Sequence, residues 1–251
     1  MRWLTLASIL LNVIFSGIYD RITDVPSIAE VTGYFPTYFT PSSYAFTIWL
    51  VIYLAFIVYG IIQVLPSQRN HTIYGKLSIP LIAVNFLQVA WIACYTTLHT
   101  GISVIILAAA LVVSFVLFFR AHRAVLYDNY NLWLQLPFCL LASWLVVALA
   151  GGLSVYFKSE NISFYFGEGV ITILMILIAS AIALLINLRT SSLVFPAVIA
   201  WAFFAINDAR KEDAPAIAEI ALSAAILLPV ISLISAVSRK VKPHQEVHHS
   251  H

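Results

Sequence analysis

The sequence has little charge: Lys, Arg, Asp and Glu make up 10% of its 251 residues, whereas hydrophobic residues make up 62%. Ordinary soluble domains carry about 25% charged residues. A soluble protein must cover much of its surface with polar groups, so this composition argues against a soluble domain. A bilayer removes the difficulty, because a spanning helix needs about 20 mostly apolar residues. We therefore predict an all-α, polytopic membrane helix bundle.

The residues that build common chemical sites are also scarce. The two cysteines, Cys94 and Cys139, lie in apolar segments, which is typical of small buried residues and argues against a disulfide framework. The sequence has no glycine-rich phosphate loop, nucleophile elbow or zinc-ligand spacing. We therefore expect a protein that is not an enzyme and has no metal site.

Two further partner classes are disfavoured. No basic cluster with interleaved aromatic residues is present, so we expect no nucleic-acid partner. All five lysines fall in predicted loops or tails, which argues against a retinal Schiff base, and no histidines face each other within the predicted bundle as a b-type haem would require. We expect no tightly bound cofactor.

Long apolar segments dominate what is present, and we predict about eight transmembrane helices. They cover residues 3–18, 43–65, 77–98, 102–119, 132–157, 170–188, 192–206 and 216–237. A polar, proline-containing segment, residues 19–42, connects the first two. The seventh segment is short for a span and contains Pro196 near its start, where a missing N–H donor is tolerated.

The distribution of basic residues predicts the orientation. Most of the 13 Lys and Arg residues fall on one side of the predicted bundle, the side of both termini. Those on that side are Arg2, Arg69, Lys76, Arg120, Arg123, Arg189, Arg239, Lys240 and Lys242; Arg21, Lys158, Arg210 and Lys211 lie on the other. Since cytoplasmic loops carry the excess of basic residues, we expect both termini in the cytoplasm.

Aromatic residues gather at one predicted depth. Trp49, Trp91 and Trp144 come from three different spans, in the middle or outer part of each, and an aromatic loop precedes the second span. Flat rings at one depth suit a flat apolar ligand, although large side chains also simply pack bundles. Trp3 and Trp133 lie at the opposite interface, where we interpret them as anchors.

Two amides share a helix face with one of these tryptophans. Asn85, Gln88 and Trp91 are three residues apart. Polar amides in hydrocarbon usually face the bundle interior, where they bond another helix more often than a ligand. Glu219 is the one carboxylate within a predicted span, about a turn from its outer end, so snorkelling to the interface is favoured over an ion site.

The segment Phe39–Tyr53, F-T-P-S-S-Y-A-F-T-I-W-L-V-I-Y, resembles the loop-to-helix motif of the tryptophan-rich sensory proteins, the TspO/MBR family, and especially its longer bacterial members. Residues 85–91 resemble that family's third helix, with its amide and tryptophan. Residues 136–148, L-P-F-C-L-L-A-S-W-L-V-V-A, resemble its fifth helix. The residues that depart from the pattern common in compact members are Ser42, Tyr44, Gly151 and Gly152. These departures affect the expected identity of the ligand and leave the expected fold unchanged.

The resemblance implies a TspO-like five-helix membrane core over residues 1–157. A three-helix membrane extension (158–242) and a His-rich tail (243–251) would follow it. Compact members bind tetrapyrroles such as porphyrins, and some bind sterols, between the helices beneath the first loop. The implied ligand-binding residues are Tyr34, Phe39, Pro41, Tyr44, Phe46, Trp49, Tyr53, Asn85, Gln88, Trp91, Tyr95, Pro137, Phe138, Trp144 and Ala148.

The resemblance favours a membrane receptor or transport protein that binds a porphyrin or another flat apolar ligand for sensing, sequestration or translocation. Its location would be the bacterial inner membrane. A secondary transporter of another small molecule is one alternative. A structural or assembly subunit of a membrane complex is another, in which the aromatic residues would serve packing alone. Besides the lipid bilayer, a homodimer or membrane-complex partner fits these hypotheses.

Overall fold

The structure is a computed structural model that describes the backbone of residues 1–241 and the side chains of residues 1–238. The predicted His-rich tail, residues 243–251, lies outside the described residues. The described chain is helical without strands, which confirms the all-α prediction. Its helices are α1 (Arg2–Thr23), α2 (Ile28–Tyr34), α3 (Ile48–Val64), α4 (Ile73–Thr96), α5 (Thr100–Tyr127), α6 (Leu136–Ser159), α7 (Gly167–Thr190), α8 (Val194–Arg210) and α9 (Pro215–Val241). Three short 3₁₀ turns, η1 (Ser43–Thr47), η2 (Pro66–Gln68) and η3 (Leu132–Leu134), join them.

Seven of the described helices are long and apolar enough to cross a membrane: α1, α3 together with η1, α4, α5, α6, α7 and α9. The remaining long helix, α8, has 17 residues, or about 26 Å at the usual rise per residue. It starts beside α6, where Cys139 Sγ lies 3.4 Å from Ser192 Oγ, and ends beside η1, where Ser42 hydrogen-bonds Asp208. It is therefore one continuous helix that passes along the bundle and forms no re-entrant loop. The described residues thus contain seven helices of spanning length and composition, where the sequence predicted about eight.

The connection between the first two spans contains structure that the sequence interpretation left out. α1 continues to Thr23, and Asp24 ends it in the left-handed region (φ 52°). α2 then begins with a capping box, in which Ser27 N–H donates to Glu30 Oε2 (2.7 Å) and Glu30 N–H donates to Ser27 Oγ (3.2 Å). These hydrogen bonds lower the pKa of the Glu30 carboxyl. The Ser-x-x-Glu spacing is a sequence signal for such a helix start.

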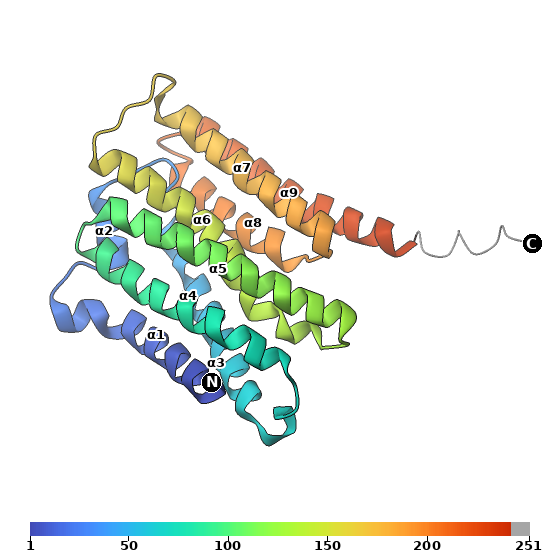
Figure 1. Cartoon of the computed structure of the whole chain (residues 1–251). Helices are drawn as coiled ribbons and strands as arrows, with labels where there is room; N and C mark the ends of the chain where they lie inside the picture. The colour runs from blue at the N-terminus through green and yellow to red at the C-terminus, as the bar shows by residue number, and fades with distance from the viewer. Residues whose placement is uncertain (242–251) are drawn as a thin grey trace, which may run out of the picture.

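The long helices run roughly side by side (Figure 1), with α6 at the centre. α6 contacts α5 on one side and α8 on another, and 61% of its spanning window is buried, the largest share among the spanning helices. α1 packs on α3 and α4, whereas α9 packs on α7 and α8. The helices that follow residue 158 therefore meet the first part of the chain at α6 and at η1, which precedes α3.

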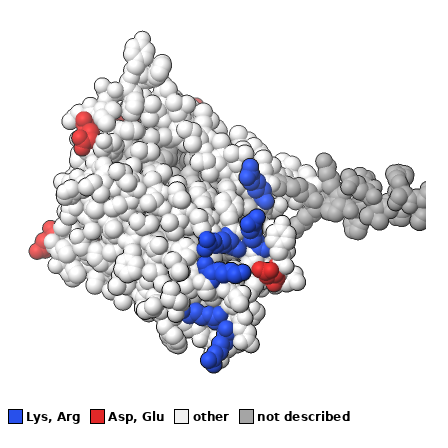
Figure 2. Space-filling view, in the orientation of Figure 1, with Lys and Arg blue, Asp and Glu red and all other residues white. Residues whose placement is uncertain are grey.

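Charge separates the two ends of the bundle. Figure 2 shows Lys and Arg gathered at one end and most of the visible Asp and Glu at the other. We call the first the basic end; its described basic side chains are Arg2, Arg69, Lys76, Arg120, Arg123 and Arg189. The opposite, acidic end holds Asp20, Asp24, Glu30, Glu160, Glu168, Asp208, Glu212 and Asp213, together with Arg21, Lys158, Arg210 and Lys211. That the basic end faces the cytoplasm stays a prediction from the excess of basic residues.

Candidate functional site

A cavity of about 60 Å³ lies toward the acidic end, between α3, α4 and α6 and beneath the loop formed by residues 35–42. We call this loop the cover loop. The walls are mostly apolar. They are formed by Ile28, Thr32, Phe39, Thr40, Pro41, Phe46, Trp49, Trp91, Tyr95, Trp144, Val147, Ala148, Gly151, Gly152 and Val155.

Three tryptophans from three helices meet at this cavity, as their depth in the sequence predicts. The rings of Trp49 and Trp144 lie edge to face, with centroids 6.4 Å apart and an interplanar angle of 81°. Phe46 meets Trp144 in the same way at 6.1 Å, whereas Trp91 stacks on Tyr95 at 5.6 Å. Edge-to-face and offset pairs are the favourable aromatic arrangements, so the rings hold one another in place.

Eight of the residues implied by the resemblance line the cavity: Phe39, Pro41, Phe46, Trp49, Trp91, Tyr95, Trp144 and Ala148. Phe39 is fully buried, with its ring in the cavity wall. Tyr53 is adjacent, since its ring stacks on Trp49 at 5.3 Å. The cavity also includes residues that the sequence interpretation did not name, among them Ile28 and Thr32 from the unforeseen helix α2.

The other implied residues lie elsewhere. Tyr34 is 58% exposed, and Tyr44 packs its ring against Trp201 of α8. Pro137 and Phe138 lie at the start of α6, toward the basic end, where Phe138 meets Tyr59 at 5.0 Å. These four side chains are not part of the cavity wall.

The two amides of α4 face inward as expected, and they bond another helix. Asn12 Nδ2 of α1 donates to Asn85 Oδ1 and to Gln88 Oε1, each at 3.2 Å. Asn85 Nδ2 donates in turn to Ser8 Oγ at 3.0 Å. All of these side chains are buried, so this network joins α1 to α4 and does not line the cavity.

The cavity contains few polar atoms. Thr32 Oγ1 lies 2.9 Å from the Tyr95 hydroxyl and donates to the carbonyl of Ile28. The indole N–H of Trp144 is buried and has no hydrogen-bond partner among the described residues. A mostly apolar wall with few polar groups suits an apolar ligand. Among the described residues, no group of three or more His, Cys, Asp and Glu side chains could hold a metal ion.

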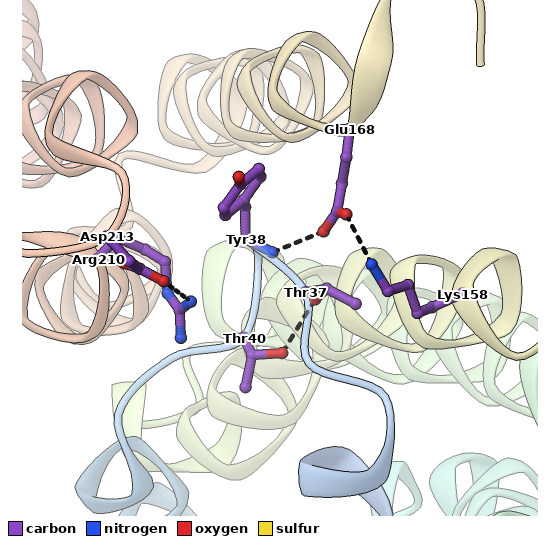
Figure 3. A network of polar contacts seen from close by, with 7 residues as sticks. All are labelled: Thr37, Tyr38, Thr40, Lys158, Glu168, Arg210 and Asp213. Atoms are coloured by element: carbon purple, nitrogen blue, oxygen red, sulfur yellow. Dashed lines mark hydrogen bonds and ion pairs between the residues drawn. The ribbon is translucent and has the colours of Figure 1, made fainter. Parts of the chain in front are cut away.

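The cover loop is fastened to α7. Tyr38 N–H donates to Glu168 Oε1 at 2.9 Å, and the other carboxylate oxygen of Glu168 pairs with Lys158 Nζ at 3.3 Å (Figure 3). Within the loop, the hydroxyls of Thr37 and Thr40 are 2.9 Å apart. The loop is thereby held over the cavity by a residue from the far half of the sequence.

The end of the cover loop and the segment just after it are fastened to α8. Ser42 N–H donates to the Ala205 carbonyl at 3.0 Å, and Ser42 Oγ donates to Asp208 Oδ2 at 3.0 Å. Trp201 Nε1 donates to the carbonyl of Ala45 at 3.2 Å. Asp208 also bonds Lys211, which raises the pKa of the Lys211 ammonium. This role of α8 was not predicted from the sequence. The tryptophan of that helix, Trp201, was the one residue that could have indicated it.

These features define a polytopic α-helical membrane protein with an aromatic cavity beneath its first long loop. The chain matches the model of the family described as TSPO-like protein over residues 2–234, and it therefore belongs to that family. The match continues through α7 and α8 and into α9. No curated protein and no solved structure matches the chain.

Proposed function

We propose that this protein is a membrane receptor or transport protein that binds a flat apolar ligand, specifically a tetrapyrrole such as a porphyrin, at the aromatic cavity. The observation that carries the proposal is the meeting of Trp49, Trp91 and Trp144 at one cavity. Family membership supports a membrane protein of the TspO type, and the mostly apolar wall supports a ligand of this chemistry. The proposed role is binding, with no chemical step.

The size of the cavity adds a condition to the proposal. Sites for drug-sized ligands have volumes of about 300–1,000 Å³, whereas this cavity has about 60 Å³. A porphyrin therefore requires the cover loop to move and Phe39 to leave the wall. The contacts that fasten the loop, at Glu168, Ala205 and Asp208, are then the contacts that control entry.

A secondary transporter that is coupled to an ion would need a charged residue within the membrane. Glu219, the one carboxylate within the predicted spans, is an exposed residue of the second turn of α9. This placement gives no support to a buried ion site, so the binding role is preferred.

The test is a titration of the purified protein in detergent with protoporphyrin IX, followed by the Soret absorbance and by quenching of tryptophan fluorescence. We expect saturable, one-site binding that weakens when a cavity tryptophan is replaced. A Trp3→Ala variant is the control, because Trp3 is 71% exposed at the basic end. Binding that is non-saturable, or equal in all variants, would exclude the cavity as a porphyrin site.

A further inference from the structure

A second, larger hollow lies at the basic end, between α3 and the start of α6. Its volume is about 630 Å³, within the range of ligand sites. We call it the α3–α6 groove. Its lining residues are Val51, Leu54, Ala55, Val58, Tyr59, Ile62, Gln68, His71, Tyr74, Asn129, Tyr130, Asn131, Trp133, Leu134, Leu136, Pro137 and Leu140.

The groove has an apolar part and a polar part. The apolar part follows α3, where Val51, Leu54 and Val58 are half-exposed on the side of a spanning helix. Along α3, residues 51 to 59 extend about 12 Å at the usual rise per residue. The polar part lies at the end of the bundle, so the groove has the polarity profile of one membrane leaflet.

The polar part consists of hydrogen-bonding groups near positive charge. His71 Nδ1 lies 3.1 Å from the Tyr130 hydroxyl, and Tyr74 Oη donates to Gln68 Oε1 at 3.2 Å. The Arg2 guanidinium lies 5.2 Å from the centre of the Tyr74 ring, and it donates to the carbonyls of Gln63, Gln68, Arg69 and His71. None of the described residues that line the groove carries a carboxylate. This electrostatic setting favours an anionic group.

Buried polar atoms without partners gather beside the groove. Tyr59 lines it and is 4% exposed, yet its hydroxyl has no hydrogen-bond partner within the part of the chain that the structure describes. One turn further along α3, Gln63 is fully buried, and neither polar atom of its side chain has a partner there. Buried polar groups are nearly always hydrogen-bonded, because leaving one unpaired costs about 1–3 kcal/mol. Tyr59 thus lines the groove with its side chain and carries a buried hydroxyl that has no partner among the described residues.

From these observations we infer that the α3–α6 groove binds one glycerophospholipid with an anionic headgroup. The phosphate and headgroup lie against Gln68, His71 and Tyr130. An ester carbonyl of the lipid accepts a hydrogen bond from the Tyr59 hydroxyl, and an acyl chain runs along Val58, Leu54 and Val51. This site is independent of the aromatic cavity, which lies toward the other end of the bundle.

The test uses delipidated, full-length protein in detergent, with lipid binding measured by native mass spectrometry. The probes are phosphatidylglycerol, phosphatidylcholine and glycerol 1-phosphate, which separate the anionic lipid, the zwitterionic lipid and the headgroup chemistry alone. We expect retention of one phosphatidylglycerol, weaker retention of phosphatidylcholine and none of glycerol 1-phosphate. Equal retention of both lipids would contradict the preference for an anionic headgroup. Binding of glycerol 1-phosphate would contradict the requirement for a lipid.

The matched variants are Tyr59→Phe and Tyr127→Phe, since Tyr127 is 78% exposed at the same end and does not line the groove. Loss of one hydrogen bond of about 1 kcal/mol corresponds to a loss of about fivefold in phosphatidylglycerol affinity for Tyr59→Phe, with no change for Tyr127→Phe. Without lipid, Tyr59→Phe should unfold at the same temperature as the wild type or higher, because it removes an unpartnered hydroxyl. Unchanged affinity in a folded Tyr59→Phe protein would overturn the site.

Discussion

The backbone N–H of Tyr38 donates to the carboxylate of Glu168 at 2.9 Å, although the two residues are 130 positions apart in the chain. Tyr38 belongs to the loop that covers the aromatic cavity, and Glu168 belongs to the first turn of α7. The helices that follow residue 158 thus hold the cover of a cavity built by α3, α4 and α6. On this basis we propose that these C-terminal helices regulate access to the cavity.

Replacing Glu168 with alanine should loosen the cover loop. The variant removes the acceptor of Tyr38 N–H and the partner of Lys158. Because Glu168 is partly exposed, we discount the interaction to about 1 kcal/mol, which corresponds to a roughly fivefold larger population of the open loop. Hydrogen exchange of residues 36–42 measures this directly. Glu160→Ala is the control, since Glu160 is an exposed carboxylate at the same end; equal acceleration in both variants would contradict the role of Glu168.

Replacing Trp49, Trp91 or Trp144 with alanine should weaken protoporphyrin IX binding. Each change removes stacking of about 0.5–1.5 kcal/mol in addition to apolar contact area. A total loss of about 2–3 kcal/mol corresponds to a weakening of about 30- to 150-fold in affinity. The measurement is a Soret titration of each variant. Trp3→Ala should bind as the wild type does, and a uniform small effect across all four variants would favour packing over binding.

Gly151→Ala should raise stability while it lowers porphyrin affinity. Alanine is favoured over glycine in a helix interior by about 1 kcal/mol. A Cβ at this position would meet Phe39 Cδ1 at 3.9 Å, an ordinary contact, and it would occupy part of the cavity. Thermal unfolding and porphyrin titration test the two effects separately. Gly17→Ala, whose Cβ meets nothing within 4 Å, should raise stability alone.

Asn12→Leu should destabilise the contact between α1 and α4. The change removes the donor shared by Asn85 Oδ1 and Gln88 Oε1 and leaves both acceptors buried. Interhelical hydrogen bonds in membranes contribute about 0.6 kcal/mol on average and up to about 1.7, so we expect a loss of about 1 kcal/mol. Chemical unfolding in detergent measures the loss. Porphyrin affinity should stay unchanged, and a large fall in affinity would mean that this network belongs to the site.

Thiol labelling tests the orientation. In a Cys94→Ser background, a cysteine at Ser163 should react with an impermeant reagent added outside the cell, and a cysteine at Ser67 should not. Both serines are exposed, and they lie at opposite ends of the bundle. The expectation follows from the excess of basic residues at the end that contains Ser67. The reverse labelling pattern would place the basic end outside.

Two kinds of feature were predictable from the sequence: the depth of a residue within its span and the helix face on which it lies. The regular rise of a helix sets the height of each tryptophan within its span, so the meeting of Trp49, Trp91 and Trp144 followed from span boundaries. The inward face of Asn85 and Gln88 followed in the same way. Their partner Asn12 did not, because helix periodicity gives the face of a residue and not the neighbouring helix.

Hydrogen-bonded pairs that are far apart in the chain could not be predicted for the same reason, because periodicity does not tell which segments become neighbours. Ser42 and Asp208 are 166 positions apart, and no local pattern pairs a loop serine with a helix-end aspartate. The short helix α2 differs from these pairs, because its capping box is local and visible as Ser27 and Glu30. Eight of the fifteen residues of the cavity wall, its three tryptophans included, were thus predicted, whereas the fastening of its cover was not.

In the proposed porphyrin site, the buried ring of Phe39 occupies space that a ligand would need. Returning a phenylalanine side chain to an exposed position costs about 1.5–3 kcal/mol. At about 2 kcal/mol, roughly one molecule in 30 would have the ring withdrawn, and every ligand would bind that much more weakly than to an open cavity. Small apolar molecules gain too little contact to offset this cost, whereas a macrocycle offsets it easily. The cost of moving one side chain, Phe39, would therefore set the smallest size of ligand that the protein binds well.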